Sequence, residues 1–135
     1  MAYHRILVPV VDGEVSEQAV SIACQLAAER KASVTAVTVV EVPVELPLDS
    51  HMFDEERATK RVLAEAAAIG DLYGVTVSGL VLRGRAAGET IVQAARVART
   101  EIIVLSAPRK FGSTVDVVLK QAPCRVMVAA TPGDR

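Results

Sequence analysis

Glycine and hydroxyl residues between Ser106 and Thr114 give this chain its clearest candidate for binding chemistry. The segment follows an apolar run and precedes a helical pattern, which predicts a turn from a strand into a helix. Gly112, Ser113 and Thr114 would open that helix, and the free N–H groups of a helix start suit an anion such as a phosphate. The turn is short, however, and Arg109 stands where a phosphate loop would need glycine. The segment is therefore predicted to be a shortened phosphate-binding turn.

The usual signatures of nucleotide-binding and catalytic sites are missing from the sequence. No Gly-x-Gly-x-x-Gly follows the first apolar run, and no Gly-x-x-x-x-Gly-Lys-Ser/Thr occurs anywhere, so a dinucleotide site of that type and a P-loop are excluded. Asp12 alone follows the first apolar run and Arg83 ends the third, so the several acids that Mg²⁺ needs do not converge. His4 and His51 are isolated. We therefore predict no metal site, no catalytic residues and no enzyme, an ATPase included.

Composition indicates one globular domain over residues 1–135, with 51% hydrophobic and 23% charged residues. The net charge of −1 gives no electrostatic reason for a nucleic-acid partner. No apolar run approaches the roughly 18 residues that span a bilayer, so direct membrane insertion is not expected. The N-terminus leaves no room for a signal peptide, and Cys24 and Cys124 fit no metal or redox spacing. A cytoplasmic protein with reduced thiols is expected.

Apolar runs typical of β-strands alternate with helical patterns along the chain. The strands are predicted at His4–Val10, Ser33–Glu41, Val75–Arg83, Glu101–Leu105 and Arg125–Ala130. The helices are predicted at Glu14–Arg30, from a cap at Asp54 onward, at Ala87–Ala98 and at Gly112–Gln121. Their buried faces are predicted to contain Val20, Ala23, Cys24 and Ala27; Leu63, Ala66, Ala67 and Gly70; and Val115, Val118, Leu119 and Ala122.

This alternation predicts the fold class. Strands that are apolar almost throughout are covered on both faces, and alternation with helices favours a parallel sheet. We therefore predict an α/β fold with a five-stranded parallel sheet and helices on both faces. Ligands of such folds bind beyond the carboxyl ends of the strands, which here correspond to residues 10–14, 40–54, 83–88 and 106–114. Within the second loop, Val42–Phe53 could be a cover over the sheet edge or only a connector.

Both ends of the chain resemble the universal stress protein family. The resemblance covers nearly the whole length and lies in Ile6–Val10 with the Asp/Gly/Glu/Ser segment after it, in Ile102–Leu105, in Gly112-Ser113, and in Ala122–Val128. It implies a five-stranded α/β fold of the adenine-nucleotide-hydrolase-like type, a cytoplasmic location, and a dimer formed through the last strand. Some members of that family bind ATP and others do not.

The ATP motif of that family is altered in this sequence. An alignment without a gap places Val11 at the family's nucleoside-binding Asp position, with Asp12 one residue later. The other interpretation of Asp12 is a helix N-cap. The family's phosphate loop has Gly, two residues, Gly, nine residues, then Gly before Ser or Thr. Here Ser106 and Arg109 stand at the first two glycines, and two residues separate Arg109 from Gly112. The resemblance therefore implies weak ATP binding or none.

Two functions remain open. The first is a regulatory or interaction module that dimerises through its last strand, with a partner such as a transporter or regulator. Its predicted interface is Arg125, Val126, Met127, Val128 and Ala129. The second is a stress sensor that binds ATP or another adenine nucleotide in an altered site, predicted to use Pro9, Val10, Asp12, Val40, Gly112, Ser113 and Thr114.

Two further features were ambiguous in the sequence. The basic residues near the predicted site could attract phosphate or could form a solvated rim; they are Arg83, Arg85, Arg109 and Lys110. Ser113 with Asp116 three residues later could also be a helix-capping pair rather than part of a ligand site.

Overall fold

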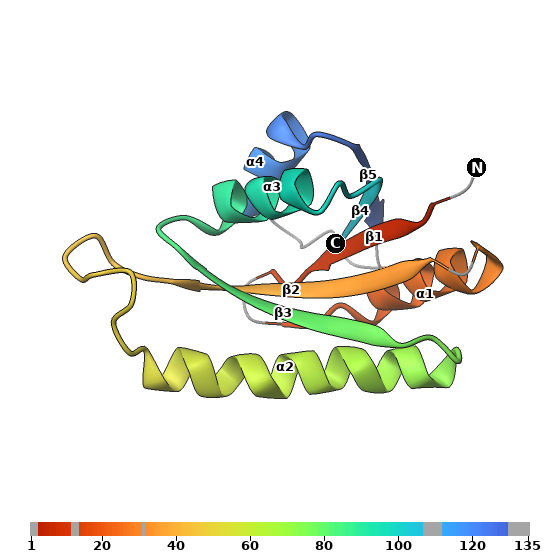
Figure 1. Cartoon of the computed structure of the whole chain (residues 1–135), viewed down its shortest axis with the longest axis horizontal. Helices are drawn as coiled ribbons and strands as arrows, with labels where there is room; N and C mark the ends of the chain where they lie inside the picture. The colour runs from red at the N-terminus through yellow and green to blue at the C-terminus, as the bar shows by residue number, and fades with distance from the viewer. Residues whose placement is uncertain (1–2, 12–13, 31, 107–111, 130–135) are drawn as a thin grey trace.

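The computed structural model describes residues 3–11, 14–30, 32–106 and 112–129 (Figure 1). Within these residues, strands and helices alternate along the chain as the sequence predicts. The strands are β1 (Arg5–Pro9), β2 (Ser33–Glu41), β3 (Val77–Gly84), β4 (Ile102–Ser106) and β5 (Arg125–Ala129). The helices are α1 (Glu17–Arg30), α2 (Phe53–Leu72), α3 (Ala87–Val97) and α4 (Ser113–Gln121).

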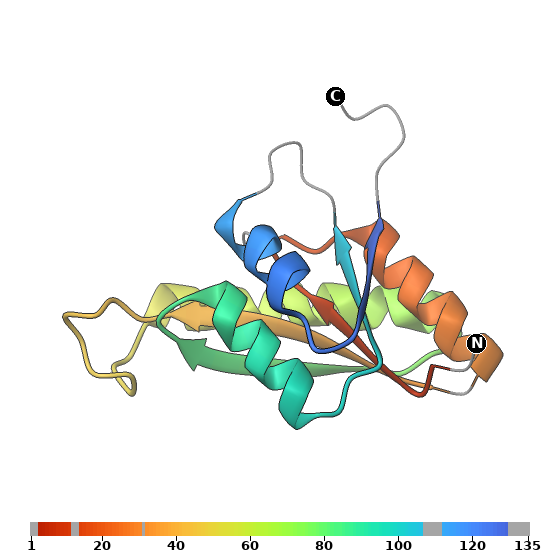
Figure 2. The same cartoon turned by 90° about the horizontal axis from the view of Figure 1, so that it is seen from above.

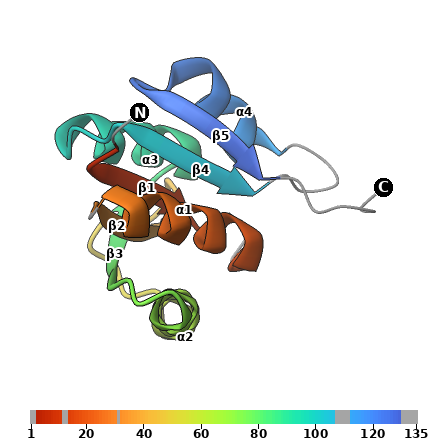
Figure 3. The same ribbon diagram turned by 90° about the vertical axis from the view of Figure 1, so that its right-hand side faces the viewer.

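The described strands form one parallel sheet in the order β3-β2-β1-β4-β5. Helices α1 and α2 cover one face of this sheet, and α3 and α4 cover the other (Figure 3). The central strands β1 and β4 are buried between these layers, which explains why their sequences are apolar without alternation. The predicted α/β fold class is confirmed.

Two strands of the sheet extend beyond the others. The pairing of β1 with β2 ends at Pro9 and Val37, whereas the pairing of β2 with β3 continues to Glu41 and Gly84. The loop of residues 42–52 follows and projects past the carboxyl ends of the strands (Figures 1 and 2). The long β2–β3 pair thus extends past the end of β1, and residues 38–41 of β2 are called its ledge below.

The predicted buried faces are correct for α1 and partly wrong for the other two helices. All of the predicted residues of α1 are buried. In α2, the buried residues are Thr59, Val62, Ala66 and Gly70, while Leu63 and Ala67 are only half-buried because this helix covers the edge strand β3. In α4, Leu119 is 40% exposed, since the helix packs chiefly on α3 through its opposite side.

Three predicted helix starts also need correction. Helix α1 begins at Glu17, and its cap is Ser16, whose Oγ accepts the N–H of Ala19 at 3.1 Å. Asp12, for which the sequence also offers a capping role, lies outside the described residues. Helix α2 begins at Phe53 after an N-cap at Met52, so the predicted cap Asp54 lies within the first turn, where its charge favours the helix dipole.

The third correction concerns α4. Its N-cap is Gly112, and among the described residues no side-chain hydrogen bond caps this helix. Ser113 is the first helical residue, so it does not form the predicted capping pair with Asp116. The Asp116 carboxylate instead forms an ion pair with Lys120 one turn later, at 3.1 Å. Within the described chain, the start of α4 keeps its backbone N–H groups without a capping side chain.

Candidate functional site

A pocket of about 430 Å³ lies at the carboxyl ends of the strands. Its described lining comes from the residues after β1, from the ledge of β2, and from the starts of α2, α3 and α4. The chain leaves β1 for β2 on one side and reaches β4 on the other, so the loops diverge at this point of the sheet. Both the position and the volume are those of a small-molecule site.

The wall of this pocket combines apolar side chains with nearly as much polar surface. Valine and alanine side chains make up the apolar part, and the polar residues among those described are Thr38, Thr59, Thr114, Glu41 and Glu55. Thr38 and Thr59 are almost fully buried. The Thr59 hydroxyl donates to the Glu56 carbonyl at 2.6 Å, which leaves its oxygen able to accept a further hydrogen bond. Apolar side chains beside a few oriented hydroxyls suit a planar organic ligand.

Glu41 places a carboxylate at the start of α3. It is the last residue of β2, and its Oε2 accepts the N–H of Ala87 at 2.8 Å. Ala87 is the first residue of α3, whose own N-cap, Ala86, makes no side-chain cap bond. The helix start that would attract an anion is therefore already bound to a carboxylate of the same chain. Glu55, in the first turn of α2, contributes a second carboxylate to the lining.

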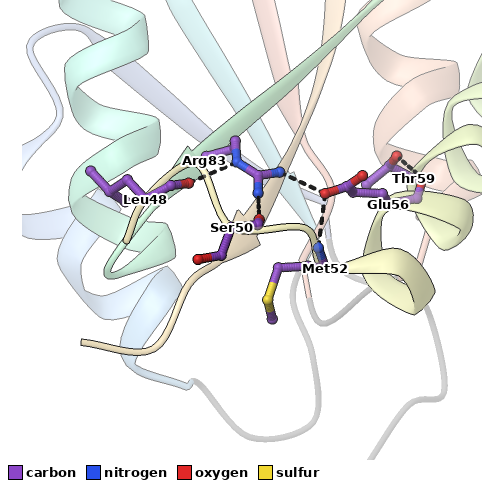
Figure 4. Close-up of polar contacts among 6 residues, drawn as sticks. All are labelled: Leu48, Ser50, Met52, Glu56, Thr59 and Arg83. Carbon is purple, nitrogen blue, oxygen red and sulfur yellow. Dashed lines mark hydrogen bonds and ion pairs between the residues drawn. The ribbon is translucent and has the colours of Figure 1, made fainter. Parts of the chain in front are cut away.

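Arg83 does not face the pocket. It lies near the end of β3, where its Nε donates to the Leu48 carbonyl at 2.9 Å and another guanidinium nitrogen donates to the Ser50 carbonyl (Figure 4). Its remaining nitrogen forms an ion pair with Glu56 at 2.9 Å. The same Glu56 carboxylate accepts the N–H of Met52 at 2.9 Å. These two contacts hold the pKa of the Glu56 carboxyl below its usual range, the Met52 N–H having the larger effect.

Arg85 has a similar role one step further along the chain. One of its guanidinium nitrogens donates to the carbonyls of Val42, Pro43 and Leu46, at 3.2, 2.5 and 2.7 Å. Arg83 and Arg85 are thus both engaged by carbonyls of the loop, although Arg85 is also exposed to solvent. Both fasten the loop of residues 42–52 to the sheet, a role that neither interpretation from the sequence included. Arg109 and Lys110 lie outside the described residues.

Comparison with known proteins identifies the family. The model of the universal stress protein family matches residues 2–130. The chain belongs to this family. It is similar to universal stress protein MJ0531 of Methanocaldococcus jannaschii, at 30% identity over 145 residues, covering 96% of this chain and 84% of that protein.

Solved structures of universal stress proteins share the fold. The protein from Archaeoglobus fulgidus in complex with dAMP is 23% identical, with a TM-score of 0.78, covering 95% of this chain and 98% of that one. A universal stress protein in complex with cAMP is 21% identical, with a TM-score of 0.74, covering 97% of this chain and 99% of that one. At these identities the likeness supports the fold of this universal stress protein, and the bound nucleotides are properties of the other proteins.

The predicted site residues of this universal stress protein occupy different places. Val10, Val40 and Thr114 line the pocket. Pro9 is buried at the end of β1, and Gly112 and Ser113 are exposed at the start of α4 without lining the pocket, while Asp12 lies outside the described residues. In the described part of the chain, no group of three or more His, Cys, Asp or Glu side chains could hold a metal ion.

The two carboxylates of the pocket, Glu41 and Glu55, are not among the residues that the sequence predicts for the site. Glu41 carries a usable signal, because it is a charged residue at the carboxyl end of an otherwise apolar strand. Glu55 carries none, because it lies among other acids in the first turn of a long helix.

The loop that the sequence predicts to be either a cover over the sheet edge or a connector is fastened to the sheet and does not line the pocket. None of the described residues from 42 to 53 belongs to the pocket wall. Among them, Val44 and Phe53 are largely exposed, and the His51 ring stacks on Phe53 with centroids 5.1 Å apart.

The helices of the described chain are all too short or too polar to cross a membrane.

Proposed function

We propose that this universal stress protein is a regulatory protein that binds an adenine nucleotide in the pocket at the carboxyl ends of its strands. The pocket carries this proposal, because it combines apolar side chains with buried hydroxyls at the switch point of the sheet. Members of the family with the same fold are described as complexes with dAMP and cAMP, which supports an adenine nucleotide as the ligand. The proposal includes no catalytic step.

Affinity for ATP is proposed to be weak. Ser106 and Arg109 stand where the family has glycines, and too few residues follow Arg109 to surround a triphosphate. A helix start contributes about 0.3–1 kcal/mol to holding an anion, and about 2 kcal/mol in good geometry. Micromolar affinity corresponds to about −8 kcal/mol. The start of α4 therefore cannot supply tight triphosphate binding by itself, and the nucleoside part of the ligand must contribute most of the affinity.

Blocking the pocket tests this proposal. Ala58 is an exposed residue of α2 that lines the pocket, so Ala58→Phe fills it without disturbing the core. Ala64 is exposed on the same helix away from the lining, so Ala64→Phe is the matched control. We expect AMP to bind the natural chain and Ala64→Phe alike in calorimetric titrations, and Ala58→Phe at least about tenfold more weakly. Absence of AMP binding to the natural chain, or equal binding to both variants, would refute the proposal.

We also propose a homodimer formed through β5, with the whole of residues 1–135 acting as one domain. β5 is an edge strand of the described sheet, and Met127 and Val128 are each 37% exposed on it. An exposed apolar edge favours pairing with a second copy, which would satisfy the unpaired backbone groups. Arg125 and the half-buried Val126 would flank that contact, and Ala129, whose side chain is buried, would contribute backbone only.

The dimer is tested by placing a charge on the edge. We expect the natural chain to elute at the dimer mass in size-exclusion chromatography with light scattering, and Val128→Lys at the monomer mass. Val97→Lys, which puts the same charge on an exposed valine of α3, should remain dimeric. A natural chain that is monomeric, or a dimer that survives Val128→Lys, contradicts the β5 interface.

The two cysteines bear on where the protein works. Cys24 and Cys124 are free thiols, and burial raises the pKa of both, which keeps them protonated and unreactive. Unpaired cysteines favour a reducing compartment, so we propose the cytoplasm. A transporter or regulator that recognises the dimer would transmit the nucleotide signal.

A further inference from the structure

We infer that Glu41 and Glu55 make the pocket selective for adenine ligands with little or no phosphate, so that adenosine binds more tightly than AMP and AMP more tightly than ATP. This inference rests on the proposed function, since it names the ligand class of the same pocket. The inference concerns the negative charge of the pocket wall. That charge comes from Glu41 and Glu55, which lie outside the turn before α4.

The first observation is the fixed position of Glu41. The hydrogen bond from Ala87 N–H to Glu41 Oε2, at 2.8 Å, ties the end of β2 to the start of α3. The carboxylate therefore lies where a phosphate would otherwise bind the helix start. A ligand phosphate at this end of the pocket would have to displace Glu41 or lie beside its charge, and both are unfavourable.

The second observation is the charge of Glu55, unpaired in the described part of the chain. Glu55 lines the pocket from the first turn of α2, and within the described residues it has no ion-pair partner. Its neighbour Glu56 is engaged by Met52 and Arg83, as Figure 4 shows. The Glu55 charge is thus left to act on whatever enters the pocket. Two carboxylates in the lining of one pocket both repel an anionic ligand.

The third observation is the lack of compensating cations. No lysine or arginine lines the pocket among the residues that the structure describes. The two arginines that follow this edge of the sheet, Arg83 and Arg85, bind the carbonyls of the 42–52 loop. Repulsion by the two carboxylates therefore grows with the number of phosphates, while the apolar side chains and the threonine hydroxyls act equally on every adenine ligand. The order adenosine, AMP, ATP follows.

Glutamine substitutions separate charge from structure. Glu41→Gln keeps an oxygen that accepts the Ala87 N–H and removes only the charge, and Glu55→Gln likewise removes the charge of the other carboxylate. Glu65→Gln is the matched control, because Glu65 is exposed on α2 away from the pocket and pairs with Arg61. Each variant changes the net charge equally. Binding of adenosine, AMP and ATP is measured by calorimetry in EDTA, so that magnesium cannot bridge phosphate and carboxylate.

We expect the natural chain to bind adenosine most tightly. Glu41→Gln and Glu55→Gln should each raise the affinity for ATP relative to that for adenosine by about two- to fivefold. The gain should shrink at high salt, which screens exposed charges, and Glu65→Gln should bind as the natural chain does. If ATP binds the natural chain more tightly than adenosine, or if neither pocket variant gains ATP affinity relative to adenosine, the inference is wrong while the proposed function stands. If no adenine ligand binds at all, both are wrong.

Discussion

Two helices begin at the same edge of the sheet and present opposite chemistry to the pocket. Helix α3 starts at Ala87, whose N–H is bound by the carboxylate of Glu41. Helix α4 starts after Gly112, and no side chain of the described residues caps it. Both helices have the same direction of dipole, so both would attract an anion if left alone. The difference teaches that a helix start becomes an anion site only where the rest of the chain leaves its N–H groups unbound.

This difference between the two helix starts predicts that the phosphate of a bound nucleotide lies near α4 and not near α3. In the proposed complex, a phosphate would lie at the start of α4, where Thr114 lines the pocket, and the nucleoside would lie between β2 and α2. The start of α3 would contribute shape and negative charge.

The largest effect is expected where the two helices touch. A Cβ atom on Gly88 of α3 would lie 2.8 Å from Cβ of Val117 on α4, too close for an ordinary contact. Gly88→Val should therefore force the helix starts apart and lower the free energy of unfolding by about 1–3 kcal/mol. Urea denaturation measures this loss. Gln93→Val, on the exposed side of α3, controls for helix propensity, and equal losses of stability in the two variants would contradict a clash between the helix starts.

A smaller effect is expected from removing the cap of α3. Glu41→Ala leaves the Ala87 N–H without its partner and should lower the free energy of unfolding by about 1 kcal/mol, as the loss of a helix cap does. Glu41→Gln should retain most of the stability because its amide oxygen accepts the same bond. Equal stability of the natural chain and Glu41→Ala would mean that the carboxylate does not cap α3.

The smallest effect concerns α2, whose start is bound by its own Glu56. The Met52 N–H and Arg83 keep the pKa of Glu56 lower in the folded chain than in the unfolded chain. This contribution to stability is complete above the ordinary glutamate pKa of about 4.3, and it is lost as the pH falls through the lower folded-state value. The natural chain should therefore melt above Glu56→Gln at neutral pH and lose that advantage in acid. A difference that is independent of pH would contradict an electrostatic role.

Most of the fold was predictable from the sequence because its elements rest on local patterns. Strands that are apolar throughout and the spacing of Val20, Ala23, Cys24 and Ala27 report burial directly, and the structure confirms them. Helix starts were harder, since several polar residues near α1 and α2 could each act as the cap. The predicted cap at Asp54 is wrong, since the N-cap of α2 is Met52, and the side chain that caps α1 is Ser16.

The polar chemistry of the site depends on contacts that no local pattern shows. Glu41 meets Ala87 across 46 positions of sequence, and Arg83 meets the Leu48 carbonyl across 35. Only the folded sheet brings these groups together. The sequence therefore indicated the edge where a ligand would bind, and three of its predicted residues, Val10, Val40 and Thr114, line the pocket there. It could not show that carboxylates face the pocket while the arginines face the loop.

A crystal structure of the protein with AMP tests the central claim most directly. The account predicts the nucleoside in the pocket between β2 and α2, the phosphate against the first turn of α4, and the hydrogen bond from Ala87 to Glu41 intact. A pocket without AMP at saturating concentration, or a phosphate bound to the Ala87 N–H with Glu41 displaced, would contradict it.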